Sequence, residues 1–447
     1  MLKYKNFFIP LVVSIFLIAF IHESSYFKTQ AVLNSIEYKD LLNFYITSDI
    51  HFLSKQLMDY GKAFEKFMYS GDGKQIDYIP EIFDAFIYDI KLNSPDFLLI
   101  SGDLTINGEK QSHYDLAKKL KEIEALGTDV YVIPGNHDIN NPHARSFSGE
   151  NQIKTSTITP NDFSVIYNEF GFEEAISKDT NSLSYLIAPS SDLWILMLDS
   201  NLYQHNMTIN YPEGRGMISS KTLKWIKKCS DLAKKNEANL IAVSHHNLLD
   251  HSDLINDSFT LDNNSEVIKV FESCNIPLLF SGHIHMQSIK NVNVSNSDIY
   301  DIANTSLAIY PQKFGVCNYS GKTLSFNTKE LDVAKYAIDN SIDDNILKDF
   351  KAYSKKFFSN LVLDNAVRNI SFDKSVSDSQ LAEMSETLLN IRLKYESSLD
   401  NLTWDEIINS NGFEDLKKCS SPFIKHYINI ALEGDEKNNN TLNLNFN

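Results

Sequence analysis

The feature of this sequence that most constrains its fold is a series of short apolar runs between about residue 40 and residue 330. The runs include residues 44–46, 97–100, 130–133, 240–243 and 277–280. Runs this short, bounded by Gly, Asn, Asp or Pro, are typical of fully buried strands. Longer segments with apolar residues at helical spacing, such as 116–126, separate the runs. Strands that alternate with helices predict a layered α/β domain.

Polar motifs rich in metal-binding side chains directly follow these runs. The motifs are Asp49-Ile50-His51, Gly102-Asp103, Gly135-Asn136-His137-Asp138, Ser244-His245-His246 and Gly282-His283-Ile284-His285. In open α/β sheets, sites form beyond the carboxyl ends of the strands, so we expect the five motifs to converge on one crevice. Carboxylate, imidazole and amide groups bind borderline divalent metals such as Zn, Mn and Fe. Each motif alone is a weak signal, but together they predict a metal centre.

In this order, the five motifs resemble the signature of the calcineurin-like metallophosphoesterase family, D-x-H, G-D, G-N-H-D, H and G-H-x-H. The resemblance implies a metallophosphoesterase β-sandwich flanked by helices, an α/β fold, over residues 36–330. The stretches 102–105 and 282–285 are most similar to the branch that contains bacterial cyclic nucleotide phosphodiesterases. One position departs from the family pattern, because Asn247 stands where the fourth motif often has proline.

The resemblance also implies a role for each residue of the motifs. The cofactors would be two divalent metal ions, which could be Mn, Fe or Zn. The side chains that would hold the first ion are those of Asp49, His51, Asp103 and His285. The side chains that would hold the second ion are those of Asp103, as a bridge, and of Asn136, His245 and His283. The catalytic residues would be His137, which faces the phosphate, and Asp138, which would orient His137.

The composition changes at about residue 331, where glycine and proline become rare and helical patterns prevail. Ser377 with Gln380, and Thr403 with Glu406, have the spacing of capping boxes that begin helices. We therefore expect a small all-helical C-terminal domain over residues 331–435, similar to that of extracytoplasmic members of this branch from low-GC Gram-positive bacteria. The polar end, residues 436–447, is expected to be disordered.

Residues 1–30 have the pattern of an export signal or membrane anchor. Lys3 and Lys5 precede an apolar run from Phe7 to Ile21. The run is short for a spanning helix, which takes about 20 residues, and no clear cleavage site follows it, so a cleaved signal and an uncleaved anchor both stay open. Positive residues before the run favour a cytoplasmic N-terminus. The catalytic domain is therefore expected to be extracytoplasmic, either membrane-anchored or secreted.

The activity that the resemblance implies is the hydrolysis of cyclic nucleotides or other small phosphodiesters. Two metal ions roughly 3.5–4 Å apart would bind the phosphate oxygens and generate hydroxide for in-line attack. A phosphomonoesterase or a nucleotide pyrophosphatase is the alternative, and a non-catalytic scaffold of the same fold is less favoured because no ligand position is missing. The expected partners are a small phosphate ester and, through an uncleaved anchor, the membrane. The formal net charge of -17 argues against long nucleic acids.

Overall fold

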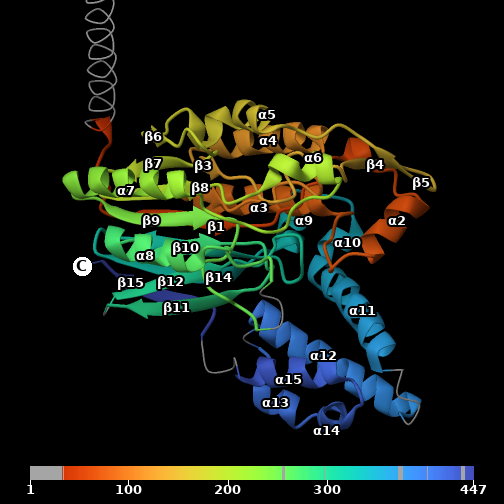
Figure 1. Ribbon diagram of the computed structural model, residues 1–447. Coiled ribbons are helices and arrows are strands. Elements are labelled where there is room, and N and C mark those ends of the chain that lie inside the picture. The colour runs from red at the N-terminus through yellow and green to blue at the C-terminus, as the bar shows by residue number, and fades with distance from the viewer. Residues whose placement is uncertain are drawn as a thin grey trace, which may run out of the picture.

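The computed structural model describes most of the chain beyond its first segment (Figure 1). The described residues are 33, 35–253, 257–295, 297–370, 376–399, 401–433 and 438–446. The predicted signal or anchor, residues 1–30, lies outside them. Within the described ranges, no helix is both long and apolar enough to cross a membrane.

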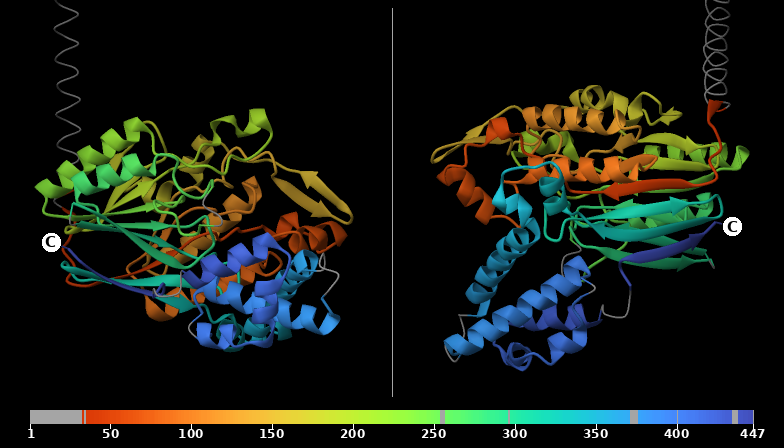
Figure 2. Two further views of the ribbon diagram at one scale, coloured as in Figure 1. Left: turned by 60° about the horizontal axis from the view of Figure 1, so that its bottom comes forward. Right: turned by 180° about the vertical axis from the view of Figure 1, so that it is seen from behind.

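Two large β-sheets form the centre of the molecule and lie face to face (Figures 1 and 2). The first sheet has the order β15-β14-β13-β1-β2-β3 and the second the order β11-β12-β10-β9-β8-β7-β6. The strands of the first sheet are β1 (Leu42–Thr47), β2 (Phe97–Ile100), β3 (Asp129–Val132), β13 (Lys313–Tyr319), β14 (Thr323–Glu330) and β15 (Thr441–Asn445). The strands of the second sheet are β6 (Ser177–Lys178), β7 (Tyr185–Ser190), β8 (Leu193–Leu198), β9 (Asn239–Ser244), β10 (Leu278–Ser281), β11 (Ser288–Val294) and β12 (Ser297–Ala303). A separate hairpin joins β4 (Arg145–Ser148) to β5 (Asn151–Lys154).

The facing sides of the two sheets share one apolar core. β1 pairs in parallel with β2 and antiparallel with β13. The ring of Phe44 in β1 stacks on that of Phe97 in β2, with centroids 4.5 Å apart. Phe280 of the second sheet meets Phe44 edge-on at 6.4 Å. These contacts hold the two sheets together as a sandwich.

Helices cover the outer faces of both sheets, because each presents an apolar side to them. α3 and α4 contribute to the core of the first sheet, whereas α7 and α8 pack on the second. The helices of this region are α2 (Lys62–Tyr69), α3 (Ile79–Asn93), α4 (Lys110–Glu124), α5 (Pro160–Ile166), α6 (Asn206–Ile209), α7 (Ser220–Lys235) and α8 (Asn264–Cys274). Short helical turns also occupy residues 55–57, 168–172 and 203–205.

The chain after the sandwich is helical, as the sequence predicts. Its helices are α9 (Val333–Asp339), α10 (Asn345–Lys348), α11 (Phe350–Ile370), α12 (Asp378–Ser397), α13 (Trp404–Ile408), α14 (Asn411–Lys418) and α15 (Pro422–Glu433). α12 to α15 gather around an apolar core of their own, on one side of the sandwich (Figure 2). Both predicted capping boxes are present, at Ser377 and at Thr403. The predicted α/β sandwich flanked by helices and followed by a helical region is therefore confirmed.

The expectation of a disordered end from residue 436 is wrong for its last part. Thr441–Asn445 forms β15, which pairs antiparallel with β14 at the edge of the first sheet. Leu442 and Leu444 alternate with polar residues in this segment, and Leu444 is buried. This alternation fits an edge strand with one face on the core. The sequence did not reveal the strand because the alternation is short and lies within an asparagine-rich stretch. The chain thus returns from the helical region to the sandwich.

One buried lysine fastens the helical region to the sandwich. Lys313 of β13 donates from Nζ to the carbonyl oxygens of Ser397 (2.9 Å) and Ser398 (3.0 Å) at the end of α12. The same ammonium donates to Oδ1 of Asn440, just before β15, at 3.1 Å. A positive charge near the carboxyl end of a helix is also favoured by the helix dipole. α12 and β15 are therefore held at one point of the first sheet.

Replacing Lys313 with methionine tests this attachment. Methionine keeps the aliphatic stem but leaves three buried oxygen acceptors without their shared donor. We expect the free energy of unfolding to fall by about 2–4 kcal/mol, measured by denaturant titration. The matched control is Lys348→Met on α10, because the Lys348 ammonium lies 3.4 Å from the exposed carboxylate of Asp343. Equal stability of the two variants would contradict the attachment.

Candidate metal centre

The predicted metal ligands lie in five loops at one edge of the sandwich. These loops follow β1, β2, β3, β9 and β10 at the carboxyl end of each strand. Backbone hydrogen bonds join them: Asp49 N donates to Gly102 O at 3.1 Å, and His51 N donates to Asp103 O at 2.9 Å. Gly282 N donates to His245 O at 3.0 Å. The convergence expected at the ends of neighbouring strands is thus present.

Several of these residues have an unusual backbone conformation. The residues with positive φ are Asp49 (51°), His51 (49°), Asp103 (47°), His283 (69°) and His285 (57°). Residues other than glycine seldom adopt this left-handed conformation. Such residues cluster at functional sites, where the surrounding structure maintains them. The backbone of the five loops is therefore shaped to direct these side chains to one place.

A first group of side chains consists of Asp49, His51, Asp103 and His285, whose ligand atoms all lie within 4.8 Å of one another. Nε2 of His285 is 3.1 Å from Oδ1 of Asp49 and 3.1 Å from Nε2 of His51. Nε2 of His51 lies 3.7 Å from Oδ2 of Asp103. The four side chains predicted to hold the first ion therefore converge on one point.

A second group consists of Asp103, His245 and His283, and it meets the same 4.8 Å limit. Nε2 of His245 is 3.4 Å from Oδ1 of Asp103 and 3.0 Å from Oδ1 of Asn136. Asp103 belongs to both groups, as a bridging ligand must. The structure thus brings together all the side chains that the sequence predicts as ligands.

The outer nitrogens of three histidines are held by oxygen acceptors. Nδ1 of His245 lies 2.9 Å from the carbonyl oxygen of Ser101, and Nε2 of His283 lies 3.1 Å from that of Ser258. Nδ1 of His285 lies 2.9 Å from a carboxylate oxygen of Asp72. Each outer nitrogen therefore donates its proton to oxygen, which leaves the other ring nitrogen available to a metal.

The charge of the cluster also favours a cation. Burial opposes protonation of His245 and His285, but the adjacent carboxylates of Asp103 and Asp49 outweigh burial and raise the pKa of each to about 9. Metal binding would displace these protons. With inward nitrogens, the carboxylate of Asp49, the shared carboxylate of Asp103 and an amide oxygen, the donor set fits two ions such as Zn, Mn or Fe.

Asp72 and Lys74 are site residues that the motifs did not reveal. They lie in the loop after α2, where Lys74 Nζ donates to both carboxylate oxygens of Asp72 at 2.8 Å. Oδ2 of the same carboxylate also contacts the ring of His285. Their only sequence signal is the short Gly71-Asp72-Gly73 stretch, which resembles any turn.

His137 lies beside the two groups, but Asp138 does not orient it. Nδ1 of His137 donates to the carbonyl oxygen of Ile106 at 2.6 Å, and its Nε2 is 3.9 Å from Oδ2 of Asp103. Asp138 is fully buried and accepts hydrogen bonds from the backbone nitrogens of Leu104, Thr105 and Gly135 at 2.8–3.0 Å. The expectation for Asp138 is therefore corrected: its carboxylate joins the second and third loops, and a carbonyl oxygen sets the ring of His137.

Asn247, the departure from the family pattern, also has a structural role. Its side-chain nitrogen donates to Oγ of Ser281 at 2.8 Å and to the carbonyl oxygen of Gly282 at 3.1 Å. Proline could make neither bond. Asn247 therefore ties the fourth loop to the fifth, close to His283.

Two adjoining cavities open over the centre. A cavity of about 350 Å³ is lined by Asp103, His137, His283 and His285 from the sandwich and by Arg392 and Glu396 from α12. A second cavity, of about 590 Å³, is lined by His51, His137 and Lys74 together with His143 and Arg145. Both cavities share Asp72, Lys74 and His137. Space is thus available on two sides of His137.

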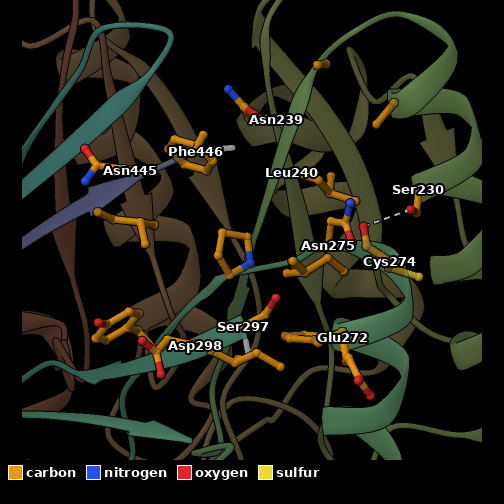
Figure 3. Close-up of a pocket in the computed structure, with 18 of the residues that line it drawn as sticks. Ser230, Asn239, Leu240, Glu272, Cys274, Asn275, Ser297, Asp298, Asn445 and Phe446 are labelled. Carbon is orange, nitrogen blue, oxygen red and sulfur yellow. Dashed lines mark hydrogen bonds between the residues drawn. The ribbon is translucent and has the colours of Figure 1, made fainter. Parts of the chain in front are cut away.

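A further cavity, of about 680 Å³, lies at the opposite ends of the strands (Figure 3). Asn239 and Leu240 at the start of β9, and Asn445 and Phe446 at the chain end, line it. In the described ranges, the groups of metal-ligating side chains lie elsewhere, around Asp103. We therefore assign the chemistry to the end of the sandwich where the five loops meet.

Comparison with known protein families identifies the chain. Residues 42–287, more than half of its length, match the calcineurin-like phosphoesterase family. The protein belongs to that family, and the resemblance inferred from the motifs is confirmed. Residues 332–438 match a second family, described as the C-terminal domain of cyclic nucleotide phosphodiesterase. The class of protein is therefore a phosphoester hydrolase with an added helical domain.

Solved structures with a similar fold are distant in sequence. A dimetal phosphatase from Danio rerio is 13% identical, with a TM-score of 0.48 over 65% of this chain and 97% of that chain. A predicted phosphoesterase from Streptococcus pneumoniae is 9% identical, with a TM-score of 0.27 over 66% of this chain and 92% of that chain. No curated protein sequence gives a significant match. The family membership rests on the match of residues 42–287.

The contact between Asp72 and His285 leads to a prediction about metal affinity. Asp72→Asn keeps the shape of the side chain but removes the charge that fixes the ring of His285. We expect metal affinity to fall by about 10–100-fold, as for other partners that orient a metal-binding histidine. Titration against a competing chelator measures the change. The control is Asp298→Asn, an exposed carboxylate at the far end of the sandwich, and equal affinities in the two variants would exclude this role.

Proposed function

We propose that this protein is a phosphodiesterase that hydrolyses small phosphodiesters, with cyclic nucleotides among the candidates, at a centre of two divalent metal ions. The observation that carries the proposal is the sharing of Asp103 between two groups of ligand side chains, with His137 beside them. The match of residues 42–287 to the calcineurin-like phosphoesterase family supports phosphoester hydrolysis, and the match of residues 332–438 favours phosphodiesters as substrates.

The metal ions, when bound, would neutralise the charge of the phosphoryl oxygens and supply a water nucleophile at neutral pH. Our proposal for the chain's own residues centres on His137. Its Nδ1 proton is held by Ile106, and its side chain is 31% exposed, so Nε2 can reach a substrate. A proton on Nε2 would pass to the leaving oxygen or stabilise a phosphoryl oxygen.

The space around His137 favours a diester over a monoester. A phosphodiester carries an organic group on each side of its phosphorus atom, whereas a monoester carries one. The cavities of about 350 Å³ and 590 Å³ meet at His137, so a phosphate bound there has room for two groups. We infer that the two cavities receive the two halves of the substrate.

We also propose that the catalytic domain lies outside the cytoplasm, held by the membrane or secreted. Lys3 and Lys5 before the apolar run support this orientation. A reporter enzyme fused after residue 447 is expected to be active only outside the membrane. Activity of an unprocessed fusion in the cytoplasm would contradict the proposal. A site in this place would meet extracellular nucleotides, lipid head groups or wall-polymer phosphodiesters.

A substrate panel on the metal-reconstituted protein tests the proposed activity. The panel contains bis- and mono-p-nitrophenyl phosphate, cyclic nucleotides, glycerophosphodiesters and sugar nucleotides. We expect kcat/KM to be higher for bis-p-nitrophenyl phosphate than for the monoester. A preference for the monoester would replace the proposal by a phosphomonoesterase, and cleavage of sugar nucleotides alone would indicate a pyrophosphatase. A protein that binds no metal and hydrolyses none of these compounds would be a scaffold.

A further inference from the structure

The helical region contributes a cationic side chain to the cavity over the metal centre. Arg392 of α12 lines the cavity of about 350 Å³ together with Asp103 and His137. The carboxylate of Glu396 is the main cause of the raised pKa of the Arg392 guanidinium, and the charge of Asp72 adds a smaller contribution. Asp72 itself bonds the predicted ligand His285. Arg392 is therefore part of the surroundings of the centre, although it lies more than a hundred residues after the last motif.

The guanidinium of Arg392 is oriented by two neighbours. Its Nε donates to Oε2 of Glu396, one turn later on α12, at 2.7 Å. Its central carbon lies 5.4 Å from the ring of Phe358, which also lines the cavity. Among the described residues, the structure shows no hydrogen bond from the two terminal nitrogens. These nitrogens form a planar pair of donors that matches two oxygens of a phosphate.

The end of α12 is fixed to the loops that carry the predicted ligands. Gln287, two residues after His285, donates from its backbone nitrogen to the carbonyl oxygen of Glu396 at 2.9 Å. Ser398 donates from Oγ to the carbonyl oxygen of Gln287 at 2.9 Å. Together with the contacts of Lys313, these bonds hold Arg392 at a set position relative to the centre.

The second cationic side chain that lines this cavity, that of Lys74, is already paired with a carboxylate. Lys74 donates to both oxygens of Asp72. By contrast, Nε of Arg392 donates to Glu396, and within the described part of the chain its terminal nitrogens have no acceptor. A single ion pair between residues one helical turn apart stabilises a helix only slightly, so stabilising α12 is a weak reason to place an arginine in the cavity wall.

Resting on the proposed function, we propose that Arg392 binds a second phosphate group of the substrate. The substrate class is then a phosphodiester that carries another phosphate on the half facing α12, as nucleotides phosphorylated at a second position do. The metal centre would bind the phosphate that is cleaved, and Arg392 would select molecules with the additional one. The helical domain is thus a specificity element of the active site.

Two esters that differ by one phosphate test this assignment. The probes are thymidine 5′-(p-nitrophenyl phosphate) and the same ester with a 3′-phosphate, and both release p-nitrophenol when cleaved. We expect the wild-type protein to prefer the phosphorylated ester by about tenfold in kcat/KM. Arg392→Gln is expected to bring this ratio close to one. The expected cause is a higher KM for the phosphorylated ester. Arg392→Lys, which keeps the charge but loses the planar pair of donors, should give an intermediate ratio.

Two matched variants separate recognition from structure. Glu396→Gln keeps the guanidinium but weakens the contact that orients it, so the preference for the phosphorylated ester should fall only in part. Lys417→Gln removes an exposed charge that pairs with Glu414 on α14, and it should keep the full preference. A wild-type ratio near one, or a ratio that survives in both Arg392 variants, would overturn the role of Arg392. If the wild-type protein cleaves neither ester, the proposed function itself fails.

Discussion

The Asp103→Asn variant is expected to lose at least one of its two metal ions and to lower kcat/KM by about 10³-fold or more. Asp103 is the one carboxylate that belongs to both groups of predicted ligands. Asparagine has nearly the same size, but it removes the shared negative charge and turns one oxygen into a nitrogen that cannot bind a cation. Elemental analysis of the folded variant gives the metal content, and hydrolysis of bis-p-nitrophenyl phosphate gives the activity.

The control for this variant is a buried aspartate away from the centre. Asp179 is buried and accepts hydrogen bonds from Asn181, Ser182 and Thr222, next to β6, the edge strand of the second sheet. Asp179→Asn is expected to lower stability while both ions stay bound. If Asp103→Asn retains both ions in full, Asp103 is not a bridging ligand and the two-ion centre is wrongly assigned.

The His137→Ala variant is expected to keep both ions and to lose about 10²–10⁴-fold in kcat, the usual contribution of a general acid. The ring of His137 is anchored by the carbonyl oxygen of Ile106, not by any of the predicted ligands, so its removal leaves both ligand groups intact. The loss should be large for an alkyl phosphodiester and smaller for a p-nitrophenyl ester, because a good leaving group departs without a proton. Comparing kcat for the two esters measures this difference.

Each other outcome for His137→Ala has a distinct meaning. Lost metal in a folded variant would make His137 a ligand. Retained metal with an equal loss on both esters would assign it to charge stabilisation. Unchanged activity would remove it from the mechanism. The control is His205→Ala, whose side chain lies in an exposed helical turn outside both cavities.

The sandwich and the positions of the predicted ligands could be foreseen because the signals are local. Each buried strand is a short apolar run, and each ligand lies within a few residues of the carboxyl end of its strand. Parallel pairing of β1 with β2 and of β2 with β3 then places Asp49, Asp103 and Asn136 at the same edge. The sequence distance between the motifs does not matter once the strands are adjacent.

The features that could not be foreseen depend on contacts between distant segments. Asp72 reaches His285 across more than two hundred residues, and nothing in its own surroundings marks it. Asp138 follows His137 directly in the sequence, which suggests that its carboxylate orients that ring. Asp138 is instead buried beneath the loops, where its carboxylate accepts hydrogen bonds from backbone nitrogens. Arg392 is one of many charged residues on a helix, and only the docking of α12 beside Gln287 brings it to the cavity.

The placement of two ions around Asp103 can be tested most directly by anomalous X-ray diffraction from crystals of the metal-reconstituted protein. We expect two anomalous peaks about 3.5–4 Å apart, on either side of the Asp103 carboxylate. One peak should lie among Asp49, His51 and His285, and the other among Asn136, His245 and His283. A single peak in fully loaded protein, or two peaks that are not adjacent to the Asp103 carboxylate, would contradict the assignment of Asp103 as a bridge between two ions.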